Sequence, residues 1–367
     1  DTQTFDAASF YENIFFAHQA WKEFAWAKEV PEEVFLTTLL PARSTQEPLG
    51  RWRRHAYEAL APVARKLKTA EEALRLVNQL SFARVKYGPT QFEDMGHYMR
   101  EQACFGRCED QTNDMVDLGK AIGLPVVSVS VPWWGKANDN HVWAGVETKE
   151  RILSVNSGDP AREKELDFNY DSGAPKVFIS HPFGTRKDVT AKFTSVTDLR
   201  IPAPATLENK AGLLVFNYGF PRTVDTARVE EGTLVFRDVG NNDILYLVAT
   251  SGQDQIRQLT HPFLLTPKGP HFFDTDPHKA KDHAFYRIGS KQVKQPLDSG
   301  KYHVVAWHEG KYKLMGTVPT MEMNGTTVLD KVHLAQGIIY RLYNDQGKNS
   351  QQHGRPFMIE DGKVVSH

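Results

Sequence analysis

The sequence predicts a mixed α+β protein that begins with helices and ends in an all-β region. Apolar residues recur at helical spacing before residue 85, one helical pattern followed by short strands fills the middle, and strands separated by turn signals run from about residue 200. We expect four parts. They are an N-terminal helical region of residues 1–85, a core of helix and sheet at 86–195, a β-sandwich module at 196–290 and a second small β module at 291–367.

The N-terminal region is predicted to be helical from two patterns. One helix face is formed by apolar residues at helical spacing, namely Phe10, Ile14, Ala17 and Trp21. Further on, Thr69 and Glu72 are placed as a capping box at the start of another helix, ahead of an apolar run. The high aromatic content here is typical of core packing.

The C-terminal half is predicted to consist of antiparallel strands. The segment "GTLVFRDVGNNDILYLVAT" is predicted to be a hairpin of two strands around residues 240–243. The turn dipeptides Glu309-Gly310 and Asp361-Gly362 each separate two strand patterns and therefore predict hairpins. Strands at this spacing with no helix between them favour β-sandwich modules.

The composition is that of a globular protein and argues against several function classes. Of the 367 residues, 40% are hydrophobic and 24% are charged, and the formal net charge is −1. No lysine and arginine run suggests nucleic-acid binding, and no apolar stretch approaches the ~18 residues that a membrane span needs. The chain begins at Asp1, which fits either removal of a targeting segment or a shortened chain.

Both cysteines lie in the segment "CFGRCEDQTNDMVDLGKAIGLPV". A helical pattern starts at Cys108 and ends before Gly123, where glycine is favoured as a helix stop. Gly106 permits close approach of the chain just before this helix start. At that position, unpaired backbone N–H groups and the helix dipole would stabilise a thiolate, the nucleophilic form of cysteine. Cys108 is therefore a candidate nucleophile.

A base and an orienting partner for Cys108 are found in the segment "NHVWAGVETKERILSVN", which is predicted to be a hairpin. A turn at Thr148-Lys149 would place His141 opposite Asn156, and the three side chains would form a Cys-His-Asn triad. A longer turn would move the partner of His141 toward Asp159 instead. Asn156 and Asp159 both remain candidates for the third position.

The cysteines could also be a buried apolar residue, a disulfide or part of a zinc site. A free cysteine is most often a small buried apolar residue, and this is our interpretation of Cys104. A disulfide between Cys104 and Cys108 would mask the nucleophile. A zinc site would need four ligands at short spacings, and the sequence offers no matching second pair.

The segment from Gly106 to Pro125, followed by His-x-Trp at residues 141–143, resembles the transglutaminase-like branch of the papain-fold cysteine enzymes. The matching residues are Gly106, Cys108, Asp110, Gly123, Pro125, His141 and Trp143. The flanking sequence resembles secreted bacterial proteins in which helices precede this domain and β-sandwich modules follow it. The resemblance implies a papain-like core and an extracytoplasmic protein, periplasmic or at the cell surface, whose signal segment is absent from this chain.

By this resemblance, Cys108 is the nucleophile and His141 the general base and acid, and Asn156 or Asp159 orients the imidazole. Trp133, Trp134 and Trp143 are candidate substrate-binding residues. The expected function is acyl transfer, with hydrolysis of a peptide or amide bond favoured over cross-linking. It needs no cofactor and no metal, and its partners would be peptide, protein or glycopeptide substrates. The alternative is an inactive scaffold of the same fold that binds glycan or protein through its β-sandwich modules.

Overall fold

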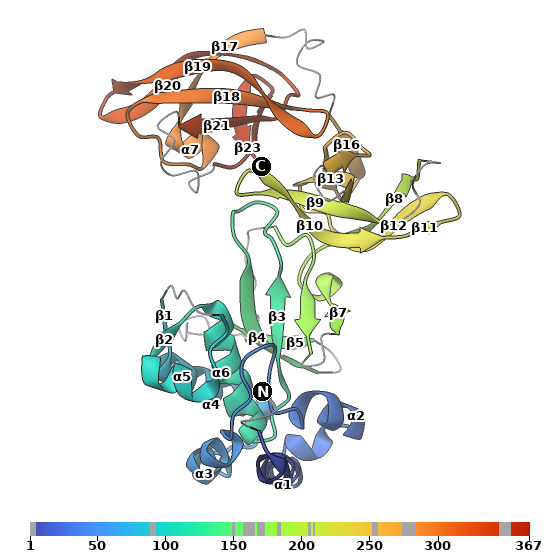
Figure 1. Cartoon of the computed structure of the whole chain (residues 1–367), viewed down its shortest axis with the longest axis vertical. Helices are drawn as coiled ribbons and strands as arrows, with labels where there is room; N and C mark the ends of the chain where they lie inside the picture. The colour runs from blue at the N-terminus through green and yellow to red at the C-terminus, as the bar shows by residue number, and fades with distance from the viewer. Residues whose placement is uncertain are drawn as a thin grey trace. The chain divides into compact units, whose positions relative to one another are not determined.

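The computed structural model confirms a mixed α+β protein with a β-rich C-terminal region (Figure 1). It describes the chain except for residues 1–4, 89–92, 149–150, 157–165, 167–172, 182–184, 205–206, 208–209, 252–255, 274–282 and 345–353. The chain divides into two compact units. Unit 1 comprises residues 1–131, 141–169 and 177–192, and unit 2 comprises residues 132–140, 170–176 and 193–367. The finer division into four parts stays a prediction.

Unit 1 combines helices with one antiparallel sheet. Its helices are α1 (Ala7–Glu23), η1 (Ala27–Glu29), α2 (Glu32–Val34), η2 (Phe35–Leu39), α3 (Arg53–Ala64), α4 (Ala70–Arg84), α5 (His97–Ala103), α6 (Cys108–Ala121) and η4 (Thr190–Lys192). The sheet has the order β5-β4-β3-β6-β7, formed by Ile152–Val155, His141–Glu147, Val126–Val131, Phe178–Ser180 and Arg186–Asp188. Two short parallel strands, β1 (Lys86–Tyr87) and β2 (Phe105–Gly106), pair separately. The predicted capping box of Thr69 and Glu72 starts α4.

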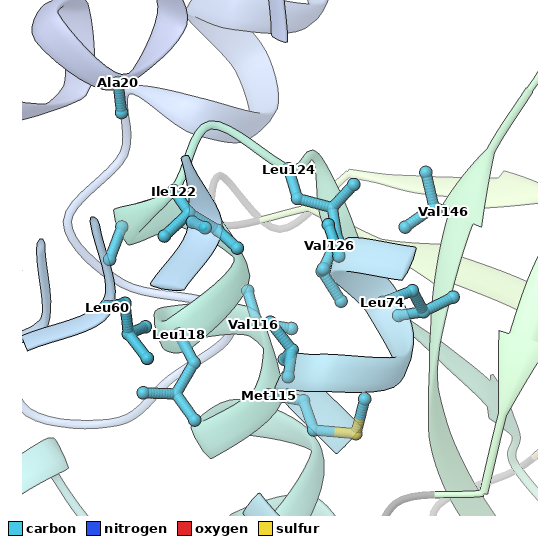
Figure 2. Packing of buried hydrophobic residues seen from close by; sticks show 14 of the residues in the cluster. Ala20, Leu60, Leu74, Met115, Val116, Leu118, Ile122, Leu124, Val126 and Val146 are labelled. Atoms are coloured by element: carbon cyan, nitrogen blue, oxygen red, sulfur yellow. The ribbon is translucent and has the colours of Figure 1, made fainter. Parts of the chain in front are cut away.

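The core of unit 1 is built around α6. Apolar side chains of α6, among them Met115, Val116 and Leu118, pack with residues of α1, α3, α4 and the sheet (Figure 2). From Asp110 to Ala121 every residue of α6 is buried, including its charged residues. The helix ends at Ala121, before Gly123 as predicted, and the φ of 69° at Gly123 is a conformation that favours glycine. This burial fixes the position of the residue with which α6 begins, Cys108.

Among the described residues of unit 2, the regular elements are strands and one short helix. A sheet of order β10-β9-β13-β15-β16, with β14 on β13, is formed by Phe220–Ala227, Ala211–Asn217, Ile244–Ser251, Phe263–Thr266, Gly269–Phe272 and Ile256–Gln258. A second sheet, β11-β12-β8, is formed by Val229–Glu230, Thr233–Gly240 and Val196–Pro202. Apolar residues of both sheets share one core, as in a β-sandwich.

A seven-stranded sheet completes unit 2, in the order β17-β20-β19-β18-β21-β22-β23. It is formed by His283–Gly289, Thr326–Ala335, Lys311–Met323, Lys301–His308, Tyr340–Asn344, Phe357–Glu360 and Lys363–Ser366, with the short helix α7 (Ser290–Val293) after β17. The hairpin turns predicted at Glu309-Gly310 and Asp361-Gly362 are both present, and all four residues have positive φ. Such angles match the right-handed twist of the strands in two-residue turns.

One strand pairing that we expected in unit 2 is absent. The strands on either side of residues 241–243, β12 and β13, do not pair with each other. β12 pairs with β8, whereas β13 pairs with β9, β14 and β15. The chain therefore crosses from one sheet of the sandwich to the other at this turn.

Candidate active site

Cys108 is the first residue of α6, as its sequence position predicted. Asp110 organises this helix start, because one carboxylate oxygen accepts the backbone N–H of Arg107 at 3.0 Å and the other accepts that of Met95 at 2.8 Å. A Cβ at Gly106 would lie 2.5 Å from the Cβ of Asp110, so a larger residue at position 106 would collide with this cap. The Gly-x-Cys-x-Asp pattern thus has a physical basis in the helix start itself.

His141 is the first residue of β4, and its imidazole is hydrogen-bonded to Asn156. The His141 Nε2 lies 2.9 Å from Oδ1 of Asn156, which follows β5 directly. An amide oxygen only accepts hydrogen bonds, so Nε2 carries the proton in this contact. The ring nitrogen with which His141 could accept a proton is then Nδ1.

The strand register that produces this contact differs from the predicted one. Ala144 pairs with Val155 and Glu147 with Ile152, so paired residue numbers sum to 299 instead of the expected 297. The same register continues to residue 148, where the Thr148 N–H donates to the carbonyl of Arg151 at 2.9 Å. The shift of two residues preserves which side chains share a face, because side chains alternate along a strand. Asn156 reaches His141 diagonally across the ladder.

Trp143 lies beneath the imidazole of His141. The two ring centroids are 5.9 Å apart at an interplanar angle of 22°, as expected for residues two apart on one strand. The Trp143 side chain is buried, with 2% exposure. Trp143 stacks against one side of the His141 ring.

The Cys108 thiol lies next to the carboxylate of Glu109 and the start of β4. Its Sγ donates to Oε2 of Glu109 at 3.2 Å. Burial first, and then the Glu109 carboxylate, raises the pKa of Cys108 to about 12. Hydrogen bonds from the backbone N–H groups of Val142 and Glu109 act in the opposite direction. The thiolate stabilisation expected from the helix start is therefore outweighed, and the thiol is neutral.

The other cysteine differs from our expectation. Cys104 is exposed, not buried, and it ends α5 in a left-handed conformation with φ 58°. Both thiols are free, so the disulfide alternative does not describe this structure. Within the described residues, no three His, Cys, Asp or Glu side chains are grouped so that they could hold a metal ion.

The remaining predicted residues lie elsewhere or outside the described chain. Asp159 is outside the described residues. Trp133 and Trp134 belong to unit 2, where Trp133 packs against the sandwich core and Trp134 is buried. Their substrate-binding role and that of Trp143 stay predictions.

The segment 132–140, which precedes His141, is held by two residues of unit 2 that the sequence analysis missed. The Asn217 amide nitrogen lies 3.0–3.1 Å from the carbonyl oxygens of Trp134, Ala137 and Asp139, which share its two hydrogens, and the amide oxygen accepts the N–H of Asp139 at 2.9 Å. Arg355 donates to the carbonyls of Gly135 and Ala137. A local sequence pattern carries no signal for such long-range contacts.

A buried ionic cluster also went unpredicted. The Asp117 carboxylate on α6 contacts the Arg100 guanidinium and lies 3.2 Å from Nδ1 of His97, and all three side chains are at most 3% exposed. Burial would raise the pKa of Asp117, but Arg100, His97 and Lys120 outweigh it and hold that pKa below its usual value. The cluster ties α5 to the buried side of α6.

Comparisons with known proteins give little further identification. No family model and no curated protein matches the chain. Among solved structures, it is similar to a candidate cysteine protease from Cytophaga hutchinsonii, at a TM-score of 0.30 and 14% identity. The alignment covers 37% of this chain and 45% of that one. In the part of the chain that the structure describes, no helix has the length and apolarity to cross a membrane.

Proposed function

We propose that this protein is a cysteine-dependent acyl-transfer enzyme with a papain-like, transglutaminase-like core that hydrolyses a peptide or amide bond. The observation that carries the proposal is the 2.9 Å contact of His141 Nε2 with Asn156 Oδ1. This contact orients His141 as a general base, whose Nδ1 would exchange a proton with Cys108. The Cys108 thiol is hydrogen-bonded to the backbone N–H of Val142, the residue after His141. Asp159 is the alternative third member of the triad.

The reaction begins with proton transfer from the Cys108 sulfur to Nδ1 of His141. The sulfur then attacks the substrate carbonyl carbon, and the imidazolium returns the proton to the nitrogen of the leaving amine as the C–N bond breaks. Water, deprotonated by His141, attacks the resulting thioester, and the acid and the thiol are released. Hydrolysis consumes one water and needs no other reactant.

The raised pKa of Cys108 fits a nucleophile that is activated only by its base. With a pKa of about 12, the thiol does not ionise into solvent at neutral pH. It gives up its proton when His141 accepts it, which leaves an ion pair of thiolate and imidazolium. The N–H groups of Val142 and Glu109 favour the thiolate, and the backbone N–H of Cys108 at the helix start would stabilise the oxyanion.

The test is hydrolysis of a library of fluorogenic peptides and glycopeptides by the full chain, with mass spectrometry of the quenched enzyme. We expect an acyl group on Cys108, and loss of both acylation and turnover in Cys108→Ala. In His141→Ala we expect turnover to fall at least about 100-fold. Cys104→Ala and His55→Ala, which alter an exposed cysteine and an exposed histidine, are the matched controls.

Hydrolysis that survives Cys108→Ala would contradict the proposal. So would a folded protein that acylates neither cysteine with any substrate. In that case the non-catalytic scaffold that binds glycan or protein would be the better description.

A further inference from the structure

We propose that Glu109 makes this site selective for substrates that carry a positive charge beside the carbonyl under attack. The inference rests on the proposed function and names its substrate class. The carboxylate of Glu109 contacts the reacting atom directly, since its Oε2 lies 3.2 Å from Cys108 Sγ. Any acyl group that reaches the sulfur must therefore come within a few ångströms of this carboxylate.

The charged side chains linked at the start of α6 carry more negative than positive charge. Asp110 on α6, Glu109 beside it and Asp94 from the segment before α5 supply three carboxylates, and Arg107 supplies one guanidinium. On β4, His141 precedes Val142, whose backbone N–H bonds the thiol. At neutral pH the three carboxylates and the guanidinium carry a formal net charge of about −2.

The carboxylates differ in how far their charge is already compensated. Asp110 is fully buried and accepts two backbone N–H groups. Asp94 accepts from Nη2 of Arg107 at 3.0 Å. Glu109 lies 3.9 Å from Nε of Arg107, beyond hydrogen-bond distance, and its side chain is 24% exposed. Glu109 is thus the carboxylate that an incoming cation can reach.

Binding of a cation would also release the nucleophile. While Oε2 accepts the S–H bond, the proton is held between sulfur and carboxylate and is not donated to His141. An ammonium or guanidinium group that pairs with Glu109 gives that carboxylate a stronger donor. The S–H bond can then turn to Nδ1 of His141, where it breaks as the N–H bond forms. Specificity and activation would depend on the same side chain.

The experiment compares two thiol reagents of opposite charge on protein with Cys104→Ser, so that Cys108 is the single cysteine. The reagents are 2-aminoethyl methanethiosulfonate, a cation, and 2-sulfonatoethyl methanethiosulfonate, an anion. Each rate is divided by the reagent's rate with 2-mercaptoethanol. We expect a preference for the cation of about tenfold or more at low salt, reduced by added salt.

Glu109→Gln is the decisive variant, because the amide keeps the size of the side chain and removes its charge. We expect the preference to fall to within about twofold, while Glu101→Gln on α5 leaves it unchanged. Equal rates for both reagents in the parent, or a preference that survives Glu109→Gln, would overturn the inference.

Paired substrates separate this inference from the proposed function. Peptides with lysine or arginine next to the scissile bond are compared with matched norleucine or citrulline peptides. Hydrolysis that is indifferent to this charge overturns the inference and leaves the enzyme proposal intact. Charge-selective labelling without hydrolysis of any peptide supports the role of Glu109 and contradicts the enzyme proposal.

Discussion

The imidazole Nε2 of His141 lies 2.9 Å from the amide oxygen of Asn156, and this contact fixes which imidazole nitrogen carries the proton. Asn156→Ala removes the acceptor, so the ring can turn and adopt the other tautomer. We expect turnover to fall about tenfold, which corresponds to ~1.4 kcal/mol for one lost orienting hydrogen bond. Steady-state kinetics measure the effect, and Asn156→Asp, which keeps an acceptor, should restore most of the rate.

The two cysteines should differ in reactivity. Cys104 is exposed, whereas burial and Glu109 raise the pKa of Cys108 to about 12. At pH 7 and without substrate, iodoacetamide should therefore modify Cys104 first, and the labelling rate of Cys108 should still be rising above pH 9. Peptide mapping measures both sites. A labelling rate of Cys108 that levels off below pH 8 would contradict this prediction.

Gly106→Ala should destabilise unit 1. Its new Cβ would lie 2.5 Å from the Cβ of the buried Asp110, so the helix start must shift. We expect a loss of about 1–3 kcal/mol in the free energy of unfolding, which urea denaturation measures. Gly50→Ala is the matched control, because nothing lies within 4 Å of its Cβ position. An unchanged midpoint in Gly106→Ala would argue against this account of the Gly-x-Cys-x-Asp pattern.

Asn217→Ala should loosen the segment that precedes His141. The fully buried amide makes hydrogen bonds to backbone groups of residues 134–139, and the substitution leaves these groups without that partner. A loss of about 2–3 kcal/mol in stability is expected, together with faster hydrogen exchange at the Asp139 amide. The exposed Asn242→Ala should change neither measurement.

The buried carboxylate of Asp117 should make the free energy of unfolding depend on pH in the acid range. Its pKa is held below the ordinary value of 3.8, so the unfolded chain binds a proton more readily than the folded one. The contribution of Asp117 is complete above about pH 4 and is lost as pH falls through the folded pKa. Asp117→Asn should cost about 3–5 kcal/mol and flatten the fall in unfolding free energy below about pH 4. The exposed Asp243→Asn should keep the parent's pH dependence.

Local chemistry explains what could be predicted from the sequence. Neighbouring residues determine the start of α6 at Cys108, its end before Gly123 and the hairpin turns at Glu309 and Asp361. All of these features are present. The expected proximity of His141 and Asn156 also holds, because a shift of two residues does not change the face of a strand.

What the sequence missed depends on distant or competing effects. The switch of sheets between β12 and β13 is decided by long-range pairing with β8 and β9. The pKa of Cys108 depends on how deeply α6 is buried, which outweighs the helix start, and on the rotamer of Glu109. Glu109 was visible beside the cysteine, but its contact with the sulfur could not be read from its position.

The chain leaves unit 1 after Val131 and re-enters it at His141, having contributed residues 132–140 to unit 2. A protein shortened to residues 1–192 would keep these nine residues but lose Asn217 and Arg355, which bind their backbone. No single cut in the polypeptide therefore yields two self-sufficient halves, and an engineer who wants the part with Cys108 and His141 alone must rebuild this connection first.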